Sequence, residues 1–90
     1  MKDLIQEGES YAQAGDRVAV ECGRLPGETA AVAFSFGYTS ALLREDRNVL
    51  NSRISRLHVL ASLRTNMEEG YDVGVSRIER DNAEWLARFQ

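Results

Sequence analysis

Cys22 and His58, which occur once each, are the residues of this chain best suited to nucleophilic catalysis. A cysteine nucleophile needs a positioned base and a third group that orients the base. Nothing in the sequence around either residue indicates such a group. His58 falls at the edge of an apolar helical face, which predicts a packing role. We therefore expect a non-enzymatic protein.

Three acids that lie close together, Glu68, Glu69 and Asp72, are potential metal ligands. A calcium-binding EF-hand loop needs alternating oxygen ligands and a glycine at fixed positions, and this segment does not have that pattern. A zinc site would need more cysteine and histidine than the chain contains. The seven glycines are scattered and form no phosphate-binding motif. The sequence predicts no metal and no other cofactor.

Arginine is the third residue type with distinctive chemistry. Lys2 is the only lysine among the 11 basic residues, and the segment from Arg47 to Met67 contains four arginines and no acid. Arginine keeps its charge, and its planar guanidinium group suits both carboxylate and phosphate. The formal net charge of −3 disfavours a general affinity for nucleic acid. We expect these arginines to meet carboxylates at a protein interface, with phosphate as the alternative.

A long helix over residues 40–69 is predicted to position these arginines, because no proline or glycine interrupts it. Apolar residues recur in it at helical spacing in two adjacent rows, with Arg53 and Arg64 between them. The first row contains Leu43, Leu50, Ile54, Leu57 and Ala61, and the second contains Leu42, Val49, Leu60 and Met67. Thirty helical residues would extend about 45 Å, whereas a compact domain of this size is about 30 Å across. We therefore predict that the second row contacts a partner.

The predicted partner-binding surface combines this second row with the arginines beside it: Leu42, Val49, Arg53, Arg56, Leu60, Arg64 and Met67. A second copy of the chain is the simplest partner, since closed two-fold dimers are the commonest soluble oligomers. A larger protein is the other possibility. The function that follows is a small protein-protein interaction module of the adaptor or inhibitor type, such as phages and plasmids carry.

Two segments of alternating large and small residues precede the long helix. The alternation on either side of Pro26-Gly27, a turn sequence, predicts a β-hairpin over residues 17–37. Short terminal helices complete the prediction: the first from a cap at Asp3 to a stop at Gly15, and the last from a capping box at Ser76. The predicted fold class is α+β, in one domain over residues 1–90, with Gly70 ending the long helix.

An all-α fold is the alternative for the first half of the chain. Five residues there also recur at helical spacing, which favours a helical hairpin that turns at Pro26-Gly27: Leu4, Tyr11, Val18, Cys22 and Leu25.

The segment Gly74–Asn82, GVSRIERDN, resembles the turn and recognition helix of helix-turn-helix repressors. In those repressors several residues separate GVS from SRIER, whereas here the two are fused. The resemblance implies an alternative function, in which a dimeric regulator binds nucleic acid through this segment or through the arginines of the long helix.

The location of the protein is predicted from three features of the sequence. It contains no run of eighteen apolar residues, so we expect no membrane span. The N-terminal MKDLIQEGES is acidic and amphipathic, unlike a signal peptide. Cys22 is the only cysteine, which fits a reducing compartment. We expect a cytoplasmic protein.

Overall fold

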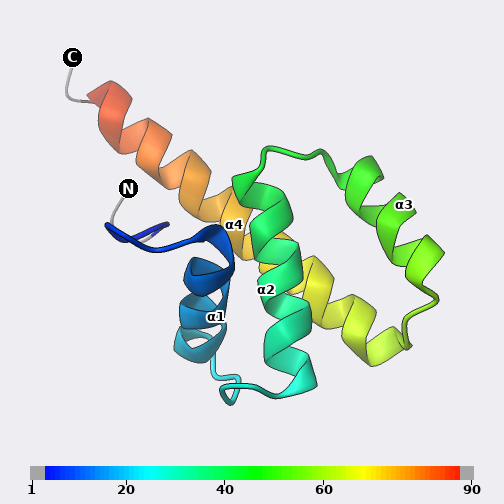
Figure 1. The fold of residues 1–90 in the computed structure, drawn as a ribbon. Coiled ribbons are helices and arrows are strands. Elements are labelled where there is room, and N and C mark those ends of the chain that lie inside the picture. Colours follow the sequence, from blue (N-terminus) through cyan, green and yellow to red (C-terminus); the bar gives the residue numbers. More distant parts are fainter. Residues whose placement is uncertain (1–3, 88–90) are drawn as a thin grey trace.

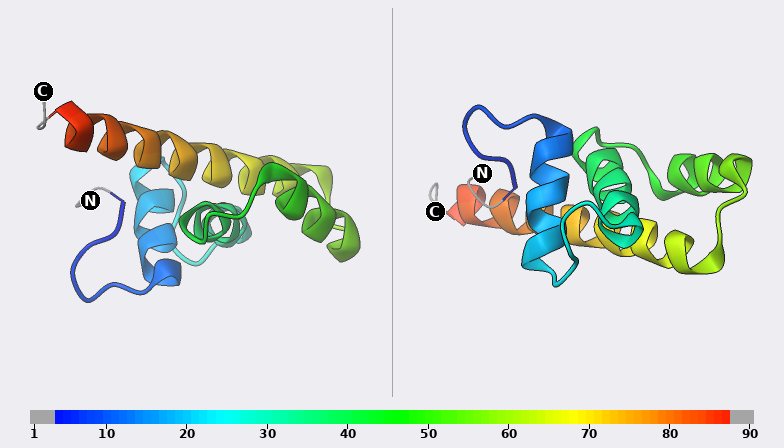
Figure 2. Two further views of the ribbon diagram at one scale, coloured as in Figure 1. Left: turned by 90° about the horizontal axis from the view of Figure 1, so that it is seen from above. Right: turned by 60° about the horizontal axis from the view of Figure 1, so that its bottom comes forward.

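The computed structural model describes the backbone of residues 4–87 and the side chains of residues 4–83. This part of the chain forms four helices and no strand: α1 (Tyr11–Glu21), α2 (Thr29–Leu42), α3 (Arg47–Leu57) and α4 (Ala61–Ala87). Helix α4 passes behind α2 in Figure 1, and α3 lies to one side, beside the first part of α4. Seen from above in Figure 2, α1 and α2 lie on the same side of α4. The predicted α+β fold class is therefore wrong, and the all-α alternative is confirmed.

The predicted β-hairpin over residues 17–37 is a helical hairpin, formed by the end of α1, a loop and the first part of α2. Gly27 has a φ of 79°, so the turn does lie where Pro26-Gly27 indicated. The alternation of large and small residues in α2 predicted a strand incorrectly, because this helix is buried around most of its circumference. Its large side chains Phe34 and Tyr38 fill the core, and small residues meet the neighbouring helices. A helix that is buried on most sides lacks the one-sided apolar stripe by which an amphipathic helix is identified in a sequence.

Glycines allow α2 and α4 to approach until their backbones touch. A Cβ on Gly37 would lie 1.8 Å from the carbonyl oxygen of Met67, and a Cβ on Gly70 would lie 2.0 Å from that of Phe34. One turn later, a Cβ on Gly74 would lie 2.6 Å from the Cβ of Ala41. Gly70, predicted to end a helix, therefore lies inside α4, because its missing side chain makes room for α2.

The predicted helix over residues 40–69 is divided among α2, α3 and α4. After α2, Arg44 adopts a φ of 61°, and the carboxylate of Asp46 then caps α3 by accepting the N–H of Val49 at 3.0 Å. His58, with a φ of 50°, ends α3. Left-handed conformations are uncommon in residues other than glycine, so nothing in the sequence indicated these two breaks. The two predicted apolar rows consequently do not lie on one helix.

The predicted terminal helices also differ from the observed ones. Ser10 and Gln13 form the capping box that begins α1, and Gly15 lies inside α1 against Ser35 of α2. The predicted cap, Asp3, lies outside the described residues. At the other end, Ser76 begins no helix, because α4 runs through it without interruption.

The hydrophobic core has two parts, one on each side of the crossing of α2 and α4. On the α1 side, Val18, Phe34 and Tyr38 are fully buried together with Leu4, whose carbonyl accepts a hydrogen bond from Tyr38 Oη at 2.5 Å. On the α3 side, the core contains Leu50, Ile54, Met67 and Tyr71. Helix α3 is further held by Arg47, which pairs with Asp72 and lies 5.0 Å from the centre of the Tyr71 ring.

Candidate protein-binding surface

The outward face of α2 carries an apolar strip that no described residue covers. The strip consists of Val32, Phe36 and Leu43, spaced so that they follow one side of α2 to its C-cap. Val32 is 59% exposed and Leu43 is 54% exposed. Large apolar side chains exposed as a contiguous group, rather than singly, mark interaction sites on soluble proteins. We call these three residues the α2 strip.

Three shallow hollows border the α2 strip and make it the floor of a trough. One of about 370 Å³ lies between α1 and α2 and includes Asp16 and Val20. A second, of about 400 Å³, reaches across α2 from Asp16 to Arg53 of α3. A third, of about 200 Å³, lies between α2 and α4. Val32 lines all three, so they form one surface, the α2 trough, lined chiefly by Asp16, Val32, Phe36, Leu43, Leu63 and Met67.

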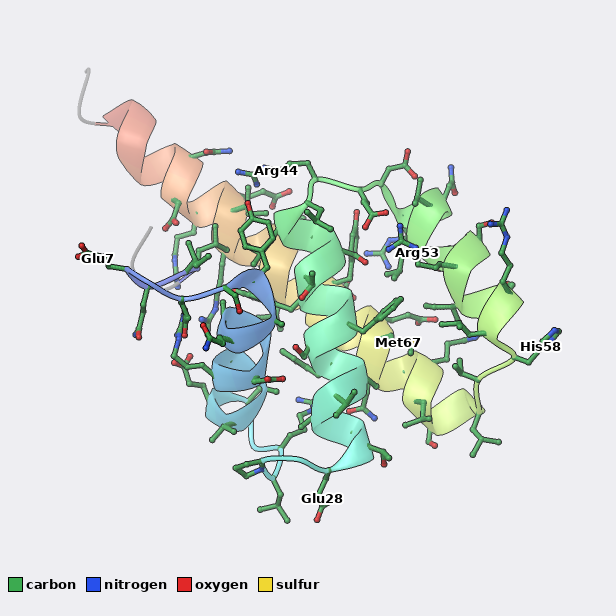
Figure 3. All side chains as sticks on the ribbon, in the orientation of Figure 1. Glu7, Glu28, Arg44, Arg53, His58 and Met67 are labelled. Atoms are coloured by element: carbon green, nitrogen blue, oxygen red, sulfur yellow. The ribbon has the colours of Figure 1, made fainter. Side chains whose placement is uncertain are left out.

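The charges around the trough are mostly neutralised by ion pairs. Arg17 binds Glu9 at 2.9 Å and Glu21 at 2.8 Å, and its hydrogen bond holds the pKa of the Glu9 carboxyl below the ordinary value. Arg53 points from α3 toward α2 (Figure 3) and binds both carboxylate oxygens of Glu45. Asp16, in contrast, forms no ion pair with a described residue. The uncompensated charge of the trough is therefore negative.

A second surface adjoins the trough along one side of α3. Val49, Ser52, Arg53 and Arg56, which we call the α3 flank, line a hollow of about 420 Å³ together with Asp46 and Asn48. Val49 is 42% exposed, and Arg56 forms no ion pair with a described residue. Because Arg53 lines both this hollow and the trough, the two surfaces are neighbours on the same face of the molecule.

The fold separates the residues that the sequence grouped as partner-binding. Leu42 and Met67 are buried, at 8% and 7% exposure, although Met67 also reaches the trough. Val49, Arg53 and Arg56 remain together on the α3 flank. Leu60, at 71% exposure, precedes the first residue of α4, and Arg64 is exposed in its first turn.

The most prominent residues of the trough, Val32, Phe36 and Asp16, were missed by the sequence reasoning. Val32, Phe36 and Leu43 do recur at helical spacing, but Val32 and Phe36 were assigned to the hairpin over residues 17–37 and Leu43 to the helix over residues 40–69.

The residues considered for catalysis and metal binding are not brought together. Cys22 ends α1 and His58 ends α3, on opposite sides of α2, and His58 points away from the molecule (Figure 3). Glu69 pairs with Arg24, and Asp72 pairs with Arg47. Within residues 4–83, no group of three or more cysteine, histidine, aspartate or glutamate side chains is arranged to hold a metal ion.

Comparison of the chain with protein-family models, curated proteins and solved structures finds no match. The fold also lacks the geometry implied by the helix-turn-helix resemblance, because Gly74–Asn82 is an uninterrupted part of α4 and contains no turn. No helix of the described residues is both long and apolar enough to cross a membrane.

Proposed function

We propose that this protein is a small, non-catalytic interaction module that binds an amphipathic helix in the α2 trough. The exposed α2 strip is the observation that carries the proposal. Full burial of a valine, leucine or phenylalanine side chain contributes roughly 1.5–3 kcal/mol. The central helix of the fold leaves three such side chains partly exposed, and a bound helix would bury them.

The dimensions and spacing of the trough fit a helical ligand. The strip extends over eleven helical steps, from Val32 to the C-cap Leu43, or about 16 Å, which is three helical turns. A partner helix in such a groove presents apolar anchors at every third or fourth position. Asp16 on the wall favours a partner with a lysine or arginine beside its apolar stripe, because complementary charge fixes orientation and raises the association rate.

A module of this kind acts by occupying a surface of another protein, as adaptors and small inhibitors do. The single cysteine, Cys22, is exposed and unpaired, which supports placing the protein in a reducing cytoplasm.

Nucleic-acid binding is a second candidate function, favoured by two exposed arginines. Neither Arg56 nor Arg64 forms an ion pair with a described residue. Arg47 and Arg53, in contrast, are neutralised by Asp72 and Glu45. This leaves a small cationic surface on an acidic protein, so we rank this function second.

Selection of binding peptides tests the proposed function. A displayed library of amphipathic helices is selected against the wild-type chain, and the affinity of the selected peptides is measured by calorimetry. Val32→Asp should weaken binding roughly 100-fold, because it places a charge on the floor of the trough. The matched control is Leu25→Asp, at a residue of similar exposure outside the hollows, and it should change nothing. Equal binding to the Val32→Asp variant would contradict the proposal.

A further inference from the structure

We infer that the occupant of the α2 trough is the α3 flank of a second copy of this chain, in a two-fold symmetric dimer. This inference deepens the proposed function and rests on it. Three features of the described surface support it: complementary charge, matching length, and the adjacency of the two surfaces on one face.

The trough and the flank each offer the other an opposite charge beside an apolar side chain. The trough presents apolar side chains beside Asp16, and the flank presents Val49 beside Arg56. Asp16 and Arg56 are both exposed, and neither forms an ion pair with a described residue. Arg56 therefore offers Asp16 of the other copy an opposite charge, and attraction of this kind selects partner and register. Asp46, which lines the same hollow as Arg56, caps α3 by accepting the N–H of Val49.

The lengths of the two surfaces also match. Helix α3 has 11 residues, or about 16 Å of helix. The α2 strip extends over the same distance, from Val32 to Leu43. One α3 can therefore cover the strip from end to end without either helix projecting beyond the other.

The adjacency of the two surfaces suits a two-fold axis. In such an interface each surface contacts its complement on the other copy, so both must lie on one face with the axis between them. Arg53 lies where the trough and flank meet. An axis near Arg53, parallel to α2, would place each flank on the opposite trough. Helices α2 and α3, which are inclined to one another in the right-hand view of Figure 2, would then meet their copies across the axis.

Arg53 would lie close to its own copy across this axis, where two like charges would repel. The two hydrogen bonds from its guanidinium group to Glu45 neutralise it within each copy. An arginine near a symmetry axis requires a neutralising partner, because it faces its own copy, and Glu45 provides that partner for Arg53.

A charge exchange between Asp16 and Arg56 tests the inference. The mass of the nuclease-treated protein is measured by light scattering after size exclusion, at several concentrations. Wild type should dimerise, and Asp16→Arg or Arg56→Asp alone should raise the dimer dissociation constant roughly 100-fold, because each places two like-charged pairs in the dimer. The double variant should dimerise again. An equimolar mixture of the single variants should form heterodimers, since both pairs then join opposite charges. Arg64→Asp, at an exposed arginine outside the flank, should have no effect.

Other results would overturn the inference. A wild-type monomer at all concentrations would exclude the second copy as occupant, and so would a dimer that the single variants leave unchanged. The same measurement on protein that has not been treated with nuclease would also contradict it if the mass included nucleic acid and fell steeply as the salt concentration rose. Failure here is distinguishable from failure of the proposed function, because peptide binding by the trough and its loss in Val32→Asp do not depend on self-association.

Discussion

Replacing Gly37 with alanine should destabilise the fold, although alanine is the better helix former. The new Cβ would lie 1.8 Å from the carbonyl oxygen of Met67, whereas ordinary contact begins at 3.4 Å. Helices α2 and α4 would have to separate by about 1.6 Å, and a gap of roughly 0.5–1 Å already removes a quarter to half of the dispersion energy of a contact. Because the obstacle is backbone, no side-chain rotation relieves the clash.

The expected size of this effect follows from two opposing contributions. Overpacking of a core costs about 1–3 kcal/mol, and the rigid contact at Gly37 favours the upper end. Alanine contributes about 1 kcal/mol of helix propensity in return. The net destabilisation should be about 2 kcal/mol, which corresponds to a fall in Tm of about 8–16 °C for a domain of this size. Urea unfolding followed by circular dichroism measures the first quantity, and a thermal scan measures the second.

A comparison with Gly74 provides the control. Its Cβ would meet the methyl group of Ala41, so Ala41→Gly should recover part of the stability lost in Gly74→Ala. The same Ala41→Gly change should not rescue Gly37→Ala. If Gly37→Ala were as stable as wild type or more stable, helix propensity would have outweighed packing, and the close approach of α2 and α4 would be refuted.

Three further changes test other contacts of the fold. Tyr38→Phe removes the donor to the buried carbonyl of Leu4 and should cost about 1–3 kcal/mol in urea unfolding, whereas Tyr11→Phe, at an exposed residue, should cost little. The hydrogen bond from Arg17 holds the pKa of the Glu9 carboxyl below its ordinary value of 4.5. The stabilisation by this pair is therefore complete above pH 4.5 and is lost as the pH falls through the lower pKa of the folded state. In the Glu9→Gln variant, Tm should therefore decrease less steeply than in wild type as the pH is lowered. The control variant Glu28→Gln should show the wild-type decrease. Ser10→Ala removes the cap of α1 and should lower the free energy of unfolding by about 0.5–2 kcal/mol. Hydrogen exchange of the backbone amides near residues 11–14 should become faster. The control Ser76→Ala, inside α4, should leave that exchange unchanged.

Local sequence signals predicted some elements of the fold correctly. The turn at Pro26-Gly27 and the inward positions of Leu50 and Ile54 were correct, because turn chemistry and helical spacing act over a few residues. The strand assignment within residues 17–37 was wrong, because packing on both sides of α2 removed the one-sided helical periodicity that would have identified a helix. Gly70 was misread for a related reason, since its role is set by α2, which is distant in sequence.

The candidate site was predicted in part. Val49, Arg53 and Arg56 were expected to share one exposed side of a helix, and they do share the α3 flank. The trough beside them was not foreseen, because it is built from α1, α2 and α4 together. The breaks at Arg44 and His58, which orient the flank against the trough, depend on left-handed residues that the sequence does not mark.

The glycine contacts between α2 and α4 also fix how the two helices align along each other. The helical hairpin of α1 and α2 is local, whereas Gly37 and Gly70 meet only after the intervening chain has closed a long loop. Sliding α4 by one turn could place Gly74 against Phe34, but Ile78 would then face Ala41. Sliding it the other way would place Asn66 against Phe34. Only the observed alignment therefore places Gly37, Gly70 and Gly74 all at the close contacts. The absence of a Cβ at these three positions determines where the 27-residue helix α4 packs on α2.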